Sequence, residues 1–250
     1  MNNYKLTVCY DGTKYRGWQK QGNTALTIQG KLEQQLSRLL GEPVEIAGCG
    51  RTDAGVHARA QVCSFRTQAA PDCETLLKQL RETLPEDIGA LSLEPAPPRF
   101  HARLSCVEKT YVYRIWNSAE PDVFERRYRY ALPEKLDLPA MRQAASLLCG
   151  RHDFASFCTA RPGKKSTVRE LRSIELQQDG AELRLVFTGD GFLYNMVRIL
   201  TGTLLEVGLG RMPASRIPAV LAAGDRAMAG PTAPAKGLIL WQVNYPDQGV

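Results

Sequence analysis

Residues 4–10 read YKLTVCY and residues 27–41 read TIQGKLEQQLSRLLG, and these two stretches decide the fold of the first half of the chain. The first stretch is rich in β-branched and aromatic residues, a composition typical of a strand. In the second, apolar side chains recur at helical spacing from Ile28 to Leu40, and Gly41 follows as a stop. The sequence therefore begins with a strand that leads into an amphipathic helix.

The remainder of the first half continues the same alternation. Residues 44–49, 60–66 and 88–93 have strand composition, and a second helix begins at Pro71-Asp72. The resulting order, β-α-β-β-α-β, is that of a ferredoxin-like split β-α-β unit. A proline-rich break at residues 95–98 follows, so we expect an N-terminal half at 1–95 and a C-terminal half at 99–250.

The second half repeats this order with one helix added. Strands are predicted at 109–116, 171–176, 182–188 and 238–243, and helices at 137–148, 192–207 and 214–223. Residues 151–167 are predicted to form a loop, and Asp179-Gly180 to turn a hairpin. The fold class expected is therefore α+β, with two ferredoxin-like halves and mostly antiparallel sheets.

Composition excludes several classes of protein. Hydrophobic residues make up 44% and charged residues 23% of the 250, as in folded globular chains. The longest stretches without a charge, 21–30 and 237–246, have about half the length of a membrane span, and no apolar targeting block follows the N-terminus. We therefore expect a soluble cytoplasmic protein without a membrane partner.

Cysteine and histidine content argues against metals and disulfides. The seven cysteines are an odd number and never occur as C-x-x-C, and the three histidines do not share ligand spacing on one helix. No G-x-x-x-x-G-K-[ST] and no G-x-G-x-x-G after a strand is present either. The sequence therefore indicates neither a metal nor a nucleotide cofactor.

A net charge of +6 favours a polyanionic partner. Basic residues cluster beside aromatic ones at 14–20 and after the proline break at 99–103, and residues 151–172 hold six Lys or Arg against two acids. Solvated loops would explain any one cluster, but three clusters next to aromatic residues favour an RNA backbone. The candidate RNA-contacting residues are Lys14, Arg16, Arg161, Lys164 and Lys165.

The densest candidate for chemistry is GCGRTDAGVH at 48–57, between two predicted strands. Its glycines permit backbone conformations or close approaches that side chains would forbid. One interpretation is a tight connection in which Asp53 forms an Asx turn and pairs with Arg51 on the surface. The other is an ionised carboxylate placed for catalysis at the end of rigid strands.

Two further positions have both a structural and a functional interpretation. Arg198 lies off the apolar stripe of its predicted helix, beside Asn195 and Gly202, and is either a solvated arginine or a partner for a carboxylate or phosphate. Tyr111 and Tyr113 point to one face of their strand, where they either pack in the core or stack on nucleobases.

The segment GRTDAGVHA at 50–58 closely resembles the signature of the tRNA pseudouridine synthase A (TruA) family. The resemblance extends to YDGTKYRGWQ at 10–19, FHAR at 100–103, K-x-Y-x-Y at 109–113, GDGFLYNMVR at 189–198 and AKGLIL at 235–240. It implies a cofactor-free homodimer that isomerises uridine to pseudouridine at positions 38, 39 and 40 of the tRNA anticodon stem-loop. It also implies roles for five residues: Asp53 as the catalytic aspartate, Arg51 beside it, Tyr111 at the target base, Arg198 pairing with the aspartate, and Leu238 lining the pocket.

A carboxylate suits this chemistry because it can trap or stabilise positive charge at a sugar carbon and then leave. Whether Asp53 attacks the sugar, attacks the base or abstracts a sugar proton stays open. Two other classes are alternatives: an RNA-binding module, which would not need Asp53, and a glycoside hydrolase, which would need a second acid near it.

Overall fold

The structure is a computed structural model that describes residues 1–159 and 166–246. The chain forms two compact units. The first comprises Met1–Val107 and the chain from Ile239 onward, and the second comprises Glu108–Leu238. No helix within the described ranges is long and apolar enough to cross a membrane.

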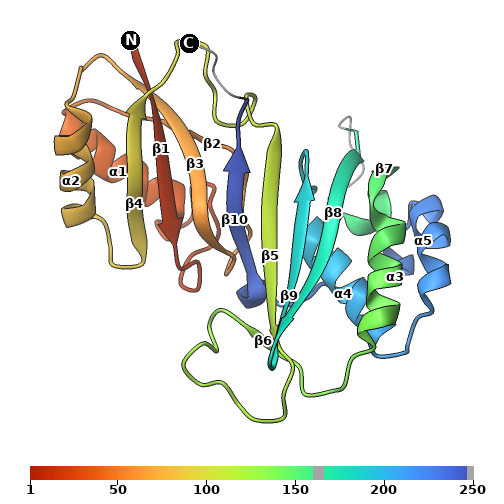
Figure 1. The fold of residues 1–250 in the computed structure, drawn as a ribbon. Helices are drawn as coiled ribbons and strands as arrows, with labels where there is room; N and C mark the ends of the chain where they lie inside the picture. Colours follow the sequence, from red (N-terminus) through yellow and green to blue (C-terminus); the bar gives the residue numbers. More distant parts are fainter. Residues whose placement is uncertain (160–165, 247–250) are drawn as a thin grey trace. The chain divides into compact units, whose positions relative to one another are not determined.

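The first unit has the predicted β-α-β-β-α-β order (Figure 1). Its elements are β1 (Asn2–Tyr10), α1 (Ile28–Leu40), β2 (Ile46–Gly48), β3 (His57–Thr67), α2 (Cys73–Thr83) and β4 (Ile88–Pro95). The central strand β1 pairs antiparallel with both β3 and β4, and β2 pairs antiparallel with β3. The last strand of the chain, β10 (Leu238–Asn244), pairs in parallel with the start of β3 at His57 and Ala58.

Side-chain caps and an apolar stripe define the first helix. The Thr27 side chain accepts a hydrogen bond from the backbone N–H of Gly30, and Gly41 ends the helix in the left-handed conformation with φ 71°. Ile28, Leu32 and Leu36 are buried, as the helical spacing predicts.

The segment after β4 belongs to the first unit. The Asn3 side chain donates to the carbonyls of Pro97 and Phe100 at 2.8 and 2.9 Å, and the backbone N–H of Ala102 donates to the Ser64 hydroxyl at 3.1 Å. These bonds attach the chain beyond the proline-rich break to β1 and β3. The first compact unit therefore extends to Val107.

The second unit is built on four antiparallel strands in the order β5-β9-β8-β7. Its elements are β5 (Glu108–Trp116), β6 (Tyr130–Ala131), α3 (Leu138–Leu148), β7 (Gly150–Asp153), β8 (Val168–Asp179), β9 (Glu182–Gly189), α4 (Met196–Gly208) and α5 (Ile217–Ala223). The hairpin predicted at Asp179-Gly180 is present, with Gly180 at φ 55°. The predicted α+β class, with two split β-α-β halves and mostly antiparallel sheets, is confirmed.

Two local predictions in this unit are wrong. Residues 151–153 lie in the predicted loop but form β7 together with Gly150, because residues 150–153 pair with residues 168–171 of β8. The helix predicted from residue 192 begins at Met196, because Asn195 adopts a left-handed conformation with φ 61° that no α-helix contains.

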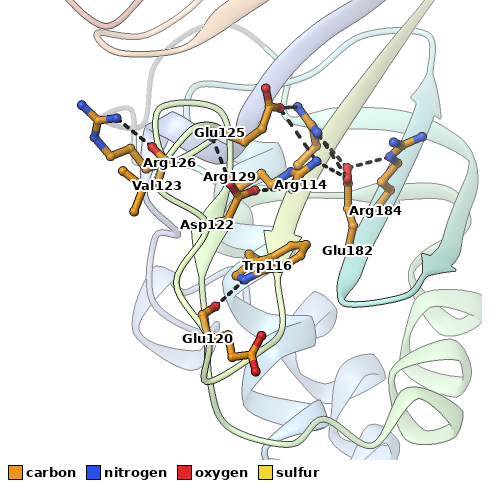
Figure 2. Close-up of polar contacts among 10 residues, drawn as sticks. All are labelled: Arg114, Trp116, Glu120, Asp122, Val123, Glu125, Arg126, Arg129, Glu182 and Arg184. Carbon is orange, nitrogen blue, oxygen red and sulfur yellow. Dashed lines mark hydrogen bonds and ion pairs between the residues drawn. The ribbon is translucent and has the colours of Figure 1, made fainter.

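An ion-pair cluster attaches the loop at 117–129 to the sheet of the second unit. Figure 2 shows Arg114, Arg129 and Arg184 around the carboxylate of Glu182, with N···O distances of 2.7, 2.6 and 2.8 Å. Arg129 also pairs with Asp122 within the loop. Burial alone would raise the pKa of Glu182, but the hydrogen bonds from Arg114 and Arg184 and the charges of Arg114 and Arg129 lower it to about 2.

Candidate active site

Asp53 lies in the loop at residues 49–56 that joins β2 to β3, which we call the aspartate loop. The Asp53 carbonyl accepts a hydrogen bond from the backbone N–H of Val56 at 3.1 Å, which closes a tight turn. Gly55 occupies this turn with φ 77°, a conformation that favours glycine. Asp53 is partly buried, whereas Arg51 is exposed.

The second sequence segment of the resemblance, residues 10–19, packs directly against the aspartate loop. The backbone N–H of Trp18 donates to the Thr52 carbonyl at 3.0 Å, and the N–H of Gly55 donates to the Tyr15 carbonyl at 3.4 Å. The Tyr10 and Thr52 hydroxyls lie 2.8 Å apart in a hydrogen bond. Two segments about 40 residues apart in sequence therefore form one structural feature.

Two glycines permit this close approach. A Cβ atom on Gly12 would lie 2.0 Å from the Val56 carbonyl oxygen, and one on Gly48 would lie 2.6 Å from the Trp18 ring. Both distances are well below van der Waals contact. The predicted use of glycine for close approaches is confirmed at Gly48, and Gly12 adds a second case.

Buried His57 anchors the end of the aspartate loop where β3 begins. Its Nδ1 accepts a hydrogen bond from the backbone N–H of Gly12 at 3.1 Å and lies 3.1 Å from Oδ1 of Asp11. The His57 ring therefore connects the two segments again. Among the described residues, no group of three or more His, Cys, Asp or Glu side chains could hold a metal ion.

In the second unit, Arg198 lies in the first turn of α4 and its guanidinium is held in place. Nε donates to the Ala233 carbonyl at 2.8 Å and Nη1 donates to Oδ1 of Asn195 at 2.9 Å. The Asn195 amide in turn donates to the Thr159 hydroxyl at 2.7 Å. Arg198 is therefore not the freely solvated arginine that the sequence left as an alternative.

Gly202 brings the segment at 230–234 against α4. A Cβ atom on Gly202 would lie 1.7 Å from the Pro231 carbonyl oxygen. One turn of helix before it, the Arg198 carbonyl accepts from the backbone N–H of Ala233 at 3.1 Å. The predicted position of Arg198 and Gly202 on one helix face is consistent with both contacting this segment.

Tyr111 and Tyr113 are both buried on β5. The Tyr111 ring packs edge-on against Phe192, with centroids 5.1 Å apart. The Tyr113 hydroxyl donates to the Pro234 carbonyl at 2.8 Å, and burial raises its pKa while the charge of Arg198 opposes that rise. Tyr113 is thus a packing residue, and Leu238 is also buried.

The predicted RNA-contacting residues lie partly within the described ranges. The Lys14 side chain is 67% exposed and 3.9 Å from an Asp87 carboxylate oxygen, and Arg16 is exposed. Arg161, Lys164 and Lys165 fall outside the described residues.

The predicted site residues are divided between the units. Asp53 and Arg51 belong to the first, and Tyr111, Arg198 and Leu238 to the second, so the pairing of Asp53 with Arg198 stays a prediction. The sequence did not indicate that the Thr159 hydroxyl accepts a hydrogen bond from Asn195. It also did not indicate that the Ala233 carbonyl accepts one from Arg198. Asn195 was noted only as a neighbour of Arg198, although asparagine adopts the left-handed backbone seen here more readily than most other non-glycine residues.

Comparison with known proteins assigns the chain to a class. A family profile described as tRNA pseudouridine synthase matches residues 6–104 and 144–246. These ranges include the aspartate loop, Arg198 and Leu238. The protein is therefore a pseudouridine synthase.

Individual relatives make the assignment more specific. The "tRNA pseudouridine synthase A" of Geobacillus kaustophilus is 46% identical over 98% of this chain and 95% of its own length, and that of Moorella thermoacetica is 46% identical over 96% and 98%. "tRNA pseudouridine synthase A 2" of Bacillus cereus is 44% identical over 98% of this chain and its own full length. The chain belongs to the tRNA pseudouridine synthase A (TruA) family and is an isomerase that modifies uridine in tRNA.

A chain of the solved structure titled "Crystal Structure of a Cbf5-Nop10-Gar1 Complex" aligns with a TM-score of 0.37 at 13% identity, covering 81% of this chain and 45% of that chain. This likeness is too distant to support an inference.

Proposed function

We propose that this protein converts uridine to pseudouridine at positions 38, 39 and 40 of the tRNA anticodon stem-loop, without a cofactor and with Asp53 as the catalytic carboxylate. The observation that carries the proposal is the aspartate loop. Its GRTDAGVHA segment carries Asp53 in a tight turn, and backbone hydrogen bonds with residues 10–18 hold this turn in place. A catalytic group must be held close to its working position, and the hydrogen bonds that hold this loop support the proposal.

The reaction requires three changes and no net gain or loss of atoms in the nucleotide. The N1–C1′ bond breaks, the freed uracil turns, and C5 bonds to C1′, after which C5 releases its proton and N1 takes one up. The Asp53 carboxylate can act as nucleophile at the sugar, as nucleophile at the base, or as base toward a sugar proton. All three routes need it ionised.

Arg198 supplies the charge that keeps Asp53 ionised in this proposal. A flipped uracil displaces water, and desolvation raises a carboxyl pKa, whereas a guanidinium close by lowers it. The contacts of Arg198 with Ala233 and Asn195 support the role because they fix the guanidinium before substrate arrives. Arg51, which is exposed two residues before Asp53, contacts the substrate.

Tyr111 and Leu238 contact the target base in this proposal. Extrusion of a base from a stem costs a few kcal/mol, and an aromatic or apolar surface offsets part of that cost. The edge-on contact with Phe192 supports this role because it holds the Tyr111 ring in one orientation. A Tyr111→Phe variant separates stacking, which it retains, from any proton relay through the hydroxyl, which it loses.

The basic residues Lys14, Arg16, Arg161, Lys164 and Lys165 contact the tRNA backbone in this proposal. The exposure of Lys14 and Arg16 supports the part of it within the described residues. Affinity for tRNA should then fall steeply as salt rises. A flat salt dependence would contradict the assignment.

We further propose that the enzyme is a cytoplasmic homodimer, as the family resemblance implies. Light scattering on the purified protein at micromolar concentration should give twice the 27.7 kDa chain mass. A mass of one chain would refute the dimer without affecting the proposed chemistry.

The central test compares Asp53→Ala with the unaltered protein. The variant should bind an anticodon stem-loop RNA normally yet release no tritium from 5-tritiated uridine. Analysis of the product from unmodified tRNA distinguishes the alternative classes, because a synthase yields pseudouridine, a hydrolase yields free uracil and a binding module yields neither. Normal tritium release by Asp53→Ala would overturn the assignment.

A further inference from the structure

A buried glutamine, Gln61 on β3, lies at the centre of the polar contacts beneath the aspartate loop. Its Oε1 accepts a hydrogen bond from the Cys49 thiol at 2.8 Å, and its Nε2 donates to the Gly50 carbonyl at 3.1 Å. The Gln61 side chain is also hydrogen-bonded to the Tyr10 hydroxyl. The Gln61 side chain has no solvent exposure; its bond to Cys49 is buried, and its bond to Gly50 is partly buried.

Tyr10, at the end of β1, extends the network to the residue before the aspartate. Its hydroxyl is 2.8 Å from the Thr52 hydroxyl, and both residues are buried. Gln61 thus holds Gly50, immediately before Arg51, while Tyr10 holds Thr52, immediately before Asp53. Gln61 and Tyr10 are therefore hydrogen-bonded to two alternate residues of the aspartate loop, Gly50 and Thr52.

Packing alone does not require polar side chains at these positions. An apolar side chain of similar volume could fill the space of Gln61, but it would leave the Gly50 carbonyl without its side-chain donor. Hydrogen bonds to the loop also fix its orientation, which dispersion contacts do not. Burial raises the pKa of Tyr10, so its hydroxyl stays neutral and able to donate throughout the working pH range.

We propose that Tyr10 and Gln61 are positioning residues for catalysis, which fix the orientation of Asp53 through Thr52 and Gly50. This inference rests on the proposed role of Asp53. Neither side chain contacts substrate: Gln61 acts through the Gly50 backbone carbonyl, and Tyr10 acts through the Thr52 side-chain hydroxyl.

The test begins with Tyr10→Phe, which keeps the ring and removes the bond to Thr52. The turnover number kcat for pseudouridine formation should fall about 10- to 100-fold, as expected for a small misplacement of a catalytic group, while KM for tRNA changes less than twofold. The matched control is Tyr4→Phe, a buried tyrosine of the same strand whose ring stacks on Phe65 with centroids 5.4 Å apart. It should leave kcat unchanged.

Thr52 provides a second, independent measurement. Thr52→Val should lower kcat as much as Tyr10→Phe does, and Thr52→Ser, which retains a hydroxyl, should restore most of it. The Tyr10→Phe and Thr52→Val double variant should lose no more than Tyr10→Phe alone, because Tyr10→Phe already removes the bond that Thr52→Val removes. Gln61→Leu should also lower kcat with KM retained, and the Thr52 series tests the network even where that variant does not fold.

The outcomes separate this inference from the function on which it rests. If Asp53→Ala is inactive while Tyr10→Phe and Thr52→Val keep kcat within twofold, the positioning role is refuted and the proposed function stands. If Asp53→Ala is active, the proposed function itself fails. Equal losses in Tyr4→Phe and Tyr10→Phe, or additive losses in the double variant, would show a general packing effect and overturn the inference.

Discussion

A single added methyl group at Gly12 tests whether the close approach of the two segments matters for catalysis. In Gly12→Ala the new Cβ would lie 2.0 Å from the Val56 carbonyl oxygen and 2.7 Å from its carbonyl carbon. Because the obstructing atoms are backbone, no rotamer change can relieve the clash. The two segments must separate by more than about 1 Å to restore ordinary contact, which begins at 3.4 Å.

A displacement of Val56 in Gly12→Ala would also displace the turn that carries Asp53. The backbone N–H of Val56 donates to the Asp53 carbonyl at 3.1 Å, so a shift of Val56 moves the turn that carries the carboxylate. A misplacement of about 1 Å can cost about 100-fold in rate, equivalent to about 2.7 kcal/mol of transition-state stabilisation. We therefore expect kcat for Gly12→Ala to fall by about two orders of magnitude.

The assay is tritium release from 5-tritiated tRNA under saturating substrate, with thermal unfolding measured in parallel. Gly22→Ala is the matched control, because a Cβ on Gly22 has no atom within 4 Å, and its activity should equal that of the unaltered protein. Gly12→Ala with normal kcat would refute the reasoning, because a packed junction of backbones could not accept the methyl group without moving Asp53.

Three further predictions concern the second unit. Gly202→Ala should lower activity at least tenfold, because its Cβ would lie 1.7 Å from the Pro231 carbonyl; unchanged tritium release would contradict this. Asn195→Ala should lower kcat several-fold by freeing one side of the Arg198 guanidinium, and steady-state kinetics checks it. The Glu182 carboxylate has a pKa of about 2 in the fold against an ordinary value near 4.5, so it stabilises the protein above pH 4.5 and loses that effect as the pH falls through 2. The difference is worth about 3 kcal/mol, and urea unfolding of Glu182→Gln at pH 7 should show a loss of that order.

Periodicity in the sequence predicted most of the fold because the long elements bury one clear face. The stripe of α1, the caps at Thr27 and Gly41 and the hairpin at Gly180 all follow from local rules that tertiary contacts do not override. The short strand β7 was missed because its sequence, GRHD, has neither alternation nor β-branched residues. It forms only because β8 offers backbone partners, which is information that lies elsewhere in the chain.

The candidate residues of the site were visible in the sequence, but the residues that are hydrogen-bonded to them were not. Residue type and glycine spacing marked the loop around Asp53 as a candidate, and the resemblance of GRTDAGVHA to the family signature favoured the catalytic interpretation over an ordinary Asx turn. Nothing local indicated that Gln61 and Tyr10 contact this loop, because a polar residue within a β-prone stretch carries no sign of its hydrogen-bond partner. The same holds for Ala233, whose contribution to Arg198 is a backbone carbonyl that any residue could provide.

The most direct test of the central claim is a nucleotide-resolution map of pseudouridine in unmodified tRNA after incubation with the purified protein or with Asp53→Asn. The expected result is pseudouridine at positions 38, 39 and 40 with the unaltered protein, and none with Asp53→Asn, although that variant still binds the tRNA. Pseudouridine formed by Asp53→Asn at the normal rate, or found only outside the anticodon stem-loop, would contradict it.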